Sequence, residues 1–356
     1  MTATTIPTAL RVKQWDDQFF SDYIRASRFN KYMGPSENAV IHTKQNLTKK
    51  KGDTIVFGLV NELNNAPTTG SAVLEGFEEA LGLRSHPISV DALRHAVVLT
   101  ELEEQAGPMD LRNAAKTRLK TWAMKHLRDD IVAALGSVDG VAYSAATATQ
   151  KNTWNTNNAD RLLYATPAHY TAGDHAASLA AIAATDTLTP DMVSRAKRMA
   201  LAASPAIRPV TVKDDEEWLV LFCHGNAFRD LKATTGMMQA NREAWGRGQD
   251  NPLFSGGDLV WDGVVIKEVP EIAAVGAVGT AGALVVPAYL CGAQAVGVAW
   301  AQRTRTVTQD TDYQFRHGVA VQEIRGVQKL RFGTGAADTD VPKDHGVLTL
   351  FCAGAA

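Results

Sequence analysis

Residues that could do metal chemistry occur in this sequence, but their spacing does not build a site. The acidic run at 214–217 offers four carboxylates, yet consecutive side chains on a regular element do not converge on one ion. Two Asp-x-Asp pairs, at 310–312 and 338–340, lack the glycine and the downstream glutamate of a calcium loop. We interpret the run as a solvated charge cluster and expect neither a metal nor a cofactor.

The candidate nucleophiles and bases are also scattered. Cys223, Cys291 and Cys352 stand in apolar surroundings without CxxC spacing, which indicates buried free thiols. The nine histidines show no HExxH spacing, and the adjacent pair Cys223-His224 is not a dyad signal. The glycine-rich segment 276–282 lacks both the dinucleotide and the P-loop spacing, so we expect a flexible apolar loop. We predict no catalytic residue.

The composition of the chain limits which classes of protein it can belong to. A chain of 356 residues exceeds the size of one hydrophobic core, so two or more subdomains are expected. The net charge of −2 does not indicate tight nucleic-acid binding, which usually requires a basic domain. The compact basic run at 49–51 could touch DNA, but we favour a charged gatekeeper beside an exposed strand. The chain begins without the pattern of a signal peptide, and no apolar run is long enough for a membrane span.

The first third of the chain predicts an element that needs a neighbour. A strand-like run at 54–60 leads through a polar excursion at 61–80 to a second arm at 88–90 and 96–99. A two-stranded hairpin is marginal in water, so we expect it to lie on another molecule. A single long amphipathic helix follows over 108–136, bounded by Pro108 and Gly136. Its apolar stripe is Leu111, Ala115, Leu119, Trp122, Leu127, Ile131 and Leu135.

Aromatic residues recur through residues 1–48 and predict an extended arm with a short helix. Apolar anchors on an arm need a groove on another molecule, although the same aromatics could instead cap the chain's own core. These residues are Trp15, Phe19, Phe20, Tyr23, Phe29 and Tyr32.

The rest of the chain predicts a mixture of helices and strands. Thr189 and Pro190 open a helix whose apolar face is Met192, Val193, Ala196 and Ala200. The apolar run 218–222 predicts a central buried strand, and Asn226 is the expected cap of the helix after it. Asp262-Gly263 predicts a hairpin turn. The small residues of 287–302 predict a helix, and strands are expected at 313–315, 319–321, 330–332 and 347–350.

This order of elements carries a resemblance to a known family. The matching phrases are Leu74-Glu75-Gly76, Leu93-Arg94-His95-Ala96, Ile207-Arg208-Pro209-Val210, Trp218-Leu219-Val220, Asn251-Pro252-Leu253-Phe254 and Trp261-Asp262-Gly263-Val264. With them the chain resembles the major capsid proteins of tailed bacteriophages, and more narrowly the short-tailed-phage coat family with the Hong Kong 97-type (Johnson) fold. The resemblance covers almost the whole chain, and it rests on the number and order of the phrases.

The resemblance implies an α+β fold with five segments. They are an N-terminal arm at 1–48, an extended β-hairpin (E-loop) with its base at 49–105, a peripheral domain at 106–212 with the spine helix 108–136, an axial domain at 213–285, and a return to the peripheral domain at 286–356 with the C-terminal strands. The expected subunit-interface residues are Trp15, Phe19, Phe20, Phe29, Tyr32, Leu63, Leu74, Phe77 and Arg94.

The implied function is structural. Such a protein self-assembles into hexamers and pentamers of an icosahedral phage head around double-stranded DNA, and it works by assembly without being an enzyme. The implied partners are copies of itself, a portal protein, scaffolding or decoration proteins and weakly held packaged DNA, with no membrane; assembly would occur in the host cytoplasm and the product is the virion capsid. Two alternatives stay open: an encapsulin-like nanocompartment shell, and a cytoplasmic α/β enzyme with an unrecognised site.

Overall fold

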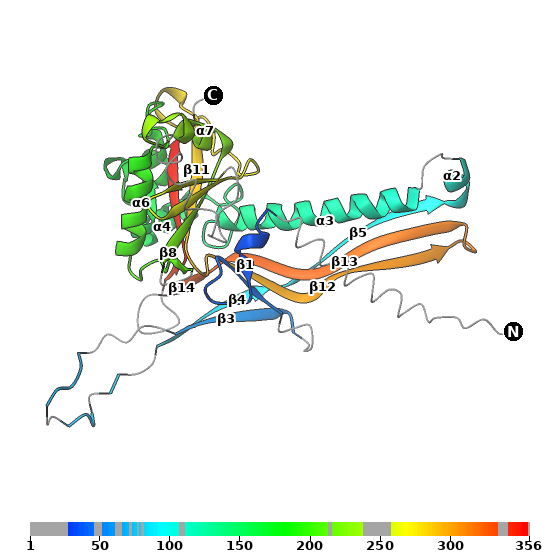
Figure 1. The fold of residues 1–356 in the computed structure, drawn as a ribbon, viewed down its shortest axis with the longest axis horizontal. Helices are drawn as coiled ribbons and strands as arrows, with labels where there is room; N and C mark the ends of the chain where they lie inside the picture. Colours follow the sequence, from blue (N-terminus) through cyan, green and yellow to red (C-terminus); the bar gives the residue numbers. More distant parts are fainter. Residues whose placement is uncertain are drawn as a thin grey trace.

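The structure is a computed structural model, and it has two parts with different shapes. A compact body surrounds a seven-stranded sheet, and a long blade of three strands and one helix projects from it (Figure 1). A separate two-stranded hairpin leaves the same junction on the other side of the blade strands (Figure 1). The residues described are 28–45, 52–60, 66–70, 73–76, 78–79, 82–106, 111–212, 216–237, 258–333 and 341–354.

The blade is built on a five-stranded sheet in the order β1-β2-β12-β13-β5. Its two long strands, β12 and β13, pair antiparallel along almost their whole length, and β5 extends them on the outer edge. The bounds are β1 Met33–Gly34, β2 Ile41–Lys44, β5 Asp91–Thr100, β12 Val296–Thr311 and β13 Arg316–Lys329. A one-turn 3-10 helix, η1 Asn30–Tyr32, precedes β1, and α2 Glu101–Ala106 follows β5.

The predicted long helix is confirmed as α3, Leu111–Leu135. At about 1.5 Å per residue its 25 residues span roughly 37 Å, and it lies along the blade strands. The buried side follows i, i+4 steps through Leu119, Ala123, Leu127 and Ile131. Trp122 is only half-buried, because it lies beside that row and stacks on His95 of β5 at 4.8 Å. The predicted stripe is therefore right except at Leu111, which is only partly buried, and at Trp122, where Ala123 takes the central place.

The body is a seven-stranded sheet in the order β6-β16-β11-β8-β10-β9, with β7 paired to β8. The predicted central strand is confirmed as β8, whose residues from Leu219 to Cys223 are all buried. The predicted hairpin turn is confirmed too, since Asp262 and Gly263 both have positive φ, at 48° and 72°. The bounds are β6 Leu162–Tyr164, β7 Val210–Thr211, β8 Glu217–Cys223, β9 Leu259–Trp261, β10 Val264–Glu268, β11 Val285–Cys291 and β16 Val347–Ala353.

Helices cover the body sheet and cap its edges. They are α4 Ala148–Asn157, α5 His175–Ala180, α6 Pro190–Ala202, α7 Gly225–Ala233, and the 3-10 turns η3 Ala159–Arg161, η4 Pro167–His169 and η6 Thr280–Gly282. The start of α6 is as predicted, because the Thr189 side chain accepts from the backbone of Met192 and Pro190 is the first helical residue. The predicted cap of α7 is wrong: the side chain of His224, and not of Asn226, accepts the backbone N–H at the helix start.

The helix predicted over 287–302 is wrong, because this segment forms parts of β11 and β12. The small residues of this segment and of β13 do allow close approach, but the element that approaches them is the hairpin strand that contains Ile88 and Ser89. A Cβ on Gly297 would lie 2.7 Å from Cδ1 of Ile88, and a Cβ on Gly326 would collide with the carbonyl oxygen of Ser89. The segment is therefore a strand because it pairs with β13 and packs against the hairpin base, and these distant contacts decide its structure over the local helical pattern.

Two further expectations change in the structure, and one is confirmed. Residues 313–315, predicted as a strand, form the turn between β12 and β13, where Asp312, Tyr313 and Gln314 all have positive φ. The strand predicted at 347–350 is confirmed as part of β16, which pairs with β11 in the body sheet. The glycine-rich loop is hydrogen-bonded to the body, since Thr280 donates from its backbone to Ile182 and from its hydroxyl to Ala180.

The predicted hairpin is confirmed as β3 Thr54–Val60 and β4 Leu83–Ser89, which pair antiparallel in register from Thr54 with Ser89 to Val60 with Leu83. A small sheet of β14 Arg331–Gly333 and β15 Pro342–Asp344 supports its base. The second arm then continues past Val90 as β5, which pairs with β13 and not with β3. Among the described residues, no helix is both long enough and apolar enough to cross a bilayer.

Candidate assembly interface

The reactive side chains that the sequence offers are used structurally. The three thiols are buried, and burial raises the pKa of Cys352 to about 12, so it stays protonated. The Nδ1 atom of His224 accepts the backbone N–H of Asn226 at the start of α7. The Nδ1 atom of His317 lies 2.8 Å from a carboxylate oxygen of Asp310. Within the described ranges, no three His, Cys, Asp or Glu side chains lie together as a metal site would need. Residues 214 and 215 of the acidic run, and the whole pair at 338–340, lie outside those ranges.

The β3–β4 hairpin has one buried face and one open face. Ile55, Phe57 and Ile88 are buried against Leu330, Phe332 and Ala299. Strand alternation then turns the opposite side chains outward. On that outer face Val56, Val60 and Leu83 are 51%, 58% and 64% exposed, and Val60 pairs directly with Leu83. An apolar surface of this kind on a projecting ribbon suits a contact with another molecule.

The hairpin's tip segment adds negative charge to this apolar face. Residues 61–83 contain four glutamates and no lysine or arginine. Among those that the structure describes, Glu75 and Glu78 are exposed, and Val73 and Leu74 are 68% and 60% exposed. The segment therefore presents carboxylates and apolar side chains together, so its complement would be apolar and cationic.

Such a complementary surface exists on the blade. His95 and Val97 of β5 face α3, so Arg94, Ala96 and Val98 face the other way. The residues opposite them on β13 and β12 lie on the same side of the sheet. Gln322 of β13 is paired with Arg94, and it accepts a hydrogen bond from Arg305 of β12 at 3.0 Å. We call this side the open sheet face; its members are Arg94, Ala96, Val98, Arg303, Arg305, Val307, Gln309, Arg316, Ala320 and Gln322.

The open sheet face is exposed in the subunit along most of its length. Val98 is 60% exposed, and Arg94, Arg305 and Arg316 are exposed as well. At the end nearest the body, Ile88 of the subunit's own hairpin lies close to Gly297 and Gly326. Among the described residues, the hairpin therefore rests on this side of the sheet at that end, and most side chains farther along the blade are exposed.

The far end of the blade carries a third exposed group. Tyr313 in the β12–β13 turn is fully exposed, and Phe315 and Leu102 of α2 are 43% and 67% exposed. The backbone of Glu101 donates to the carbonyl of Phe315, which joins α2 to this turn. Tyrosine is enriched among the residues that dominate protein interfaces, so this end of the blade is a further candidate contact.

The predicted interface residues fall into three groups. Trp15, Phe19, Phe20, Leu63 and Phe77 lie outside the described residues. Leu74 and Arg94 are exposed, which is compatible with an interface. Phe29 and Tyr32 are buried in the subunit's own core, each packed edge-on against Phe222 at 5.2 Å between ring centroids. Their placement favours the alternative that the aromatics cap the chain's own core.

The candidate interface residues that the sequence alone did not reveal are the outer hairpin face and Arg303, Arg305 and Val307 of the open sheet face. The alternation Arg303-Thr304-Arg305-Thr306-Val307 is a strand signal that could have identified the second of these. The outer hairpin face could not be assigned, because alternation by itself does not say which of two faces is buried.

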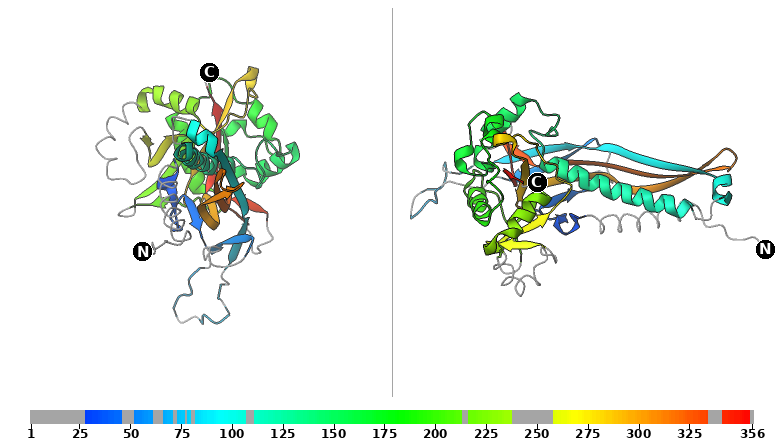
Figure 2. Two further views of the ribbon diagram at one scale, coloured as in Figure 1. Left: turned by 90° about the vertical axis from the view of Figure 1, so that its right-hand side faces the viewer. Right: turned by 90° about the horizontal axis from the view of Figure 1, so that it is seen from above.

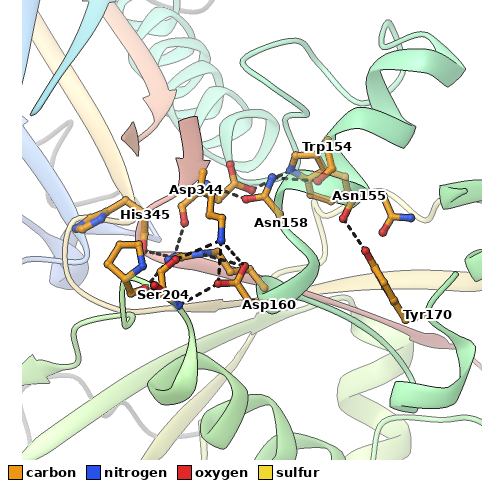
Figure 3. A network of polar contacts seen from close by, with 11 residues as sticks. Trp154, Asn155, Asn158, Asp160, Tyr170, Ser204, Asp344 and His345 are labelled. Carbon is orange, nitrogen blue, oxygen red and sulfur yellow. Dashed lines mark hydrogen bonds and ion pairs between the residues drawn. The ribbon is translucent and has the colours of Figure 1, made fainter. Parts of the chain in front are cut away.

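A buried polar network fixes the blade to the body (Figure 3). Asp344, the last residue of β15, pairs with Lys329 at the end of β13 at 2.9 Å, and both side chains are almost fully buried. The same carboxylate accepts from the indole of Trp154 on α4 at 3.0 Å. Arg161 donates to the carbonyls of Asp344 and His345 at 2.5 and 2.8 Å, and to that of Pro205. These buried bonds join the end of β13 to the elements of the body.

Comparisons with known proteins agree with this arrangement. A family model described as phage capsid protein matches residues 3–355. The major capsid protein of Pseudomonas phage KPP25 is 26% identical over 373 residues, which cover 95% of this chain and 94% of that protein. Among solved structures, the capsid asymmetric unit of cyanophage Pam1 is 35% identical over 100% of both chains, with a TM-score of 0.79. The capsid of Ralstonia phage GP4 is 26% identical over 93% of this chain and 92% of that one, with a TM-score of 0.77. The similarity includes both the blade and the body, and the predicted α+β capsid fold is confirmed.

Proposed function

This chain belongs to the phage capsid protein family and is a structural component of a phage shell, and we propose that its subunits join by laying each hairpin on the open sheet face of a neighbour. In this proposal the subunits form hexamers and pentamers, and these close an icosahedral head around double-stranded DNA.

The observation that carries the proposal is the complementarity of two surfaces that one chain exposes. The hairpin offers apolar Val56, Val60 and Leu83 with a tip segment that contains only acidic charges. The open sheet face offers apolar Val98 among exposed arginines. Opposite charges on a protein surface steer association and fix the register of a contact, while the apolar area supplies most of the free energy. Because every copy carries both surfaces, the contact can repeat around a ring.

Several parts of the proposal go beyond this contact. We propose that the chain is divided into the N-terminal arm, E-loop, peripheral domain and axial domain at the boundaries expected from the resemblance, and that residues 1–27 of the arm would reach a further neighbour. A portal protein and scaffolding or decoration proteins would complete the particle, and assembly would take place in the host cytoplasm. An encapsulin-like shell would share the fold, but the named relatives are phage capsid proteins, which supports DNA as the content.

A charge-reversal experiment tests the contact. One variant reverses the tip with Glu75→Arg and Glu78→Arg, and a second reverses the sheet with Arg94→Glu and Arg305→Glu. Each is expressed alone, and a third chain carries all four changes. Arg195→Glu, at an exposed position on α6, is the control for a surface reversal elsewhere. Shells are counted by negative-stain electron microscopy, and folding of the unassembled subunits is checked by circular dichroism.

We expect folded subunits from every variant and closed shells from the wild type and from Arg195→Glu. The tip reversal and the sheet reversal should each remove most shells, because like charges then meet at every contact. The four-fold variant should recover shells, since the attraction is restored with opposite polarity. Normal shells from both two-fold reversals would show that the two surfaces do not meet.

A further inference from the structure

Strand β5 is one edge of the five-stranded blade sheet, and among the described residues no further strand pairs with its outward side. Its ten residues pair with β13 in one unbroken register, from Arg316 with Thr100 to Arg325 with Asp91. Seen from above, β5 runs along the margin of the blade (Figure 2). The edge strands of the body sheet, β6 and β9, have only three residues each. A long, regular edge is a template on which another strand can pair.

The sequence of β5 does little to protect this edge. Between Ala92 and Leu99 it contains one Lys, Arg, Asp or Glu side chain, that of Arg94, and no proline. The pairing with β13 contains no bulge. Charges, prolines, bulges and covering elements are the features that usually keep edge strands apart. Helix α3 packs on one face of the sheet, where Trp122 stacks on His95, and a contact on a face leaves the edge itself open.

The hydrogen bonds at the end of β5 show which backbone groups point outward. The N–H of Glu101, directly after the strand, donates to the carbonyl of Phe315 at the end of β13. Successive residues of a strand point their backbone groups to opposite edges, so odd-numbered residues face β13 and even-numbered residues face outward. In the middle of β5 the outward residues are Arg94, Ala96 and Val98. No hydrogen bond joins their outward backbone groups to another described residue.

The chain closes this open stretch at both ends with its own side chains. The N–H of Ala92 donates to the carboxylate of Asp91 at 3.0 Å, and the N–H of Thr100 donates to the carboxylate of Glu103 at 3.2 Å. The outward groups that stay open between these two closures are therefore arranged symmetrically about Ala96. Such symmetry is what a strand needs to pair with a second copy of itself.

Two copies of β5 match when they lie antiparallel with their Ala96 residues face to face. The facing pairs are then Leu93 with Leu99, Arg94 with Val98, His95 with Val97, and Ala96 with itself. The three outward residues of each copy face one another, and because such a pair exchanges both backbone bonds, the ladder would have about six hydrogen bonds. Arg94 faces an uncharged valine, so no like charges meet inside the ladder. Beyond it Asp91 would face Glu101 of the second copy, and two carboxylates end the pairing there.

An aromatic side chain on α3 lies beside the midpoint of this edge. Trp122 is only half-buried, and its ring centroid lies 4.8 Å from that of His95 and 4.5 Å from that of His126. A two-fold axis perpendicular to the sheet keeps the two α3 helices on the same side of the joined sheet. The exposed part of Trp122 would then meet the second copy, and tryptophan is enriched among the residues that dominate interfaces.

We propose that the outward edge of β5 pairs with the same edge of a second copy across a two-fold axis at Ala96. We call residues 92–100 on this side the β5 edge. The contact uses backbone groups in the plane of the sheet, whereas the hairpin contact proposed above uses side chains of the open sheet face, so one copy can make both. A two-fold contact closes on itself and cannot build a ring. It would therefore join subunits of two different rings, and only this last step rests on the proposed function.

A cysteine placed at the axis tests the pairing. Ala96→Cys puts two thiols on facing residues whose Cα atoms would be about 5.5 Å apart, which is within the range of a disulfide. Val98→Cys is the matched control: Val98 is exposed on the same strand, but its Cα would lie more than about 10 Å from that of its own counterpart. The three native cysteines are buried. Both full-length proteins, unassembled and as shells, are treated with a mild oxidant and resolved on non-reducing denaturing gels.

Ala96→Cys should give at least about fivefold more disulfide-linked dimer than Val98→Cys, because only the first pair of thiols lies within reach. Unassembled protein that carries Ala96→Cys together with Glu75→Arg and Glu78→Arg should give the same dimer, since the hairpin tip is not part of the β5 edge. A dimer in that protein supports the pairing even if the hairpin contact fails its own test. Equal amounts of dimer from the two cysteine variants, or none from Ala96→Cys, would overturn the inference.

A proline variant tests the backbone bonds. Ala96→Pro removes an outward N–H and costs no hydrogen bond to β13, and proline is tolerated at such edge positions. Ala96→Val adds a side chain of similar size on the open sheet face and keeps the N–H, so it measures the effect of bulk alone. With folding checked by circular dichroism, Ala96→Pro should leave fewer shells than Ala96→Val, and equal numbers would contradict the pairing. Fewer shells from Ala96→Pro without any dimer from Ala96→Cys would mean that a different strand occupies the edge, which also overturns the pairing of β5 with itself.

Discussion

The Nδ1 atom of His175 lies 2.7 Å from the hydroxyl oxygen of Tyr164 inside the body of the subunit. The other ring nitrogen lies 2.8 Å from the hydroxyl of Tyr143, so both nitrogens have partners when the imidazole is neutral. His175 is almost fully buried, and its pKa is lowered from 6.5 to about 4. Burial is the main cause and nearby Lys151 adds to the shift, while Asp174 opposes it more weakly.

This relationship predicts that acid weakens the subunit. The pKa of His175 is lower in the folded than in the unfolded state, so its stabilising contribution is complete above pH 6.5 and is lost as pH falls toward 4. The loss would be on the order of 3 kcal/mol from this one group. Urea denaturation of the unassembled subunit at several pH values between these limits measures it. The pKa values of His86 and His345 are also lowered to about 4, mainly by burial, so His175→Asn should reduce the dependence without abolishing it. An unchanged slope in that variant would rule out His175 as a source.

A second prediction concerns the contact between the hairpin base and the blade. Any Cβ on Gly326 would collide with the carbonyl oxygen of Ser89 and lie 2.9 Å from Ile88, so Gly326→Ala must displace the hairpin. We expect a loss of about 1–3 kcal/mol of unfolding free energy and fewer shells. Gly236→Ala is the matched control, because a methyl group there would meet no atom within 4 Å, and it should change stability by less than about 1 kcal/mol. Equal melting temperatures for both variants would contradict the close packing.

The sequence predicted elements whose signals are local, and it failed where a distant partner decides. Thr189 and Pro190 define the start of α6 by themselves, and Asp262-Gly263 requires the two positive φ values of its turn. Gly297 has no such local meaning. Glycine is needed there because Ile88 approaches it from the hairpin. The sequence does not reveal this distant contact, and the small residues therefore suggested a helix where the structure has a strand.

The candidate interface was predictable to a similar extent. Arg94 was identified through a phrase shared with the capsid family, and it lies on the open sheet face. Phe29 and Tyr32 share the composition of an arm, but they fit against Phe222, which comes from a distant part of the chain. Whether an aromatic side chain enters its own core or that of a neighbour depends on such a non-local partner, which composition does not reveal.

The buried pair of Lys329 and Asp344 gives a third prediction. Both side chains are at most 2% exposed, and Asp344 also accepts from the indole of Trp154 (Figure 3). Asp344→Asn leaves the ammonium of Lys329 buried without a counter-charge, which should cost about 3–5 kcal/mol. Asp312→Asn removes the carboxylate of an exposed pair with Arg316, where both side chains are more than half exposed, and asparagine suits its positive φ. This control should change stability by less than about 1 kcal/mol.

Chemical denaturation of the two unassembled variants compares these costs directly. Lys329→Met combined with Asp344→Leu should recover much of the loss, because a buried apolar pair avoids the desolvation of two charges. If Asp344→Asn were as stable as the wild type, the network would not hold the blade to the body.

The last prediction separates folding from assembly. Replacing residues 61–80 by a short glycine-serine link removes the acidic tip segment and leaves the paired strands β3 and β4 joined. The buried face of the hairpin, Ile55, Phe57 and Ile88, stays in place, so the subunit should keep its secondary structure and its unfolding free energy within about 1 kcal/mol. Shells should be lost, because the carboxylates of Glu75 and Glu78 and the exposed Leu74 can no longer reach a neighbour. Circular dichroism and electron microscopy of the same preparation measure the two properties together. Closed shells of normal size from the shortened chain would exclude the tip from the assembly contact, whereas an unfolded subunit would show that the tip belongs to the subunit's own stability.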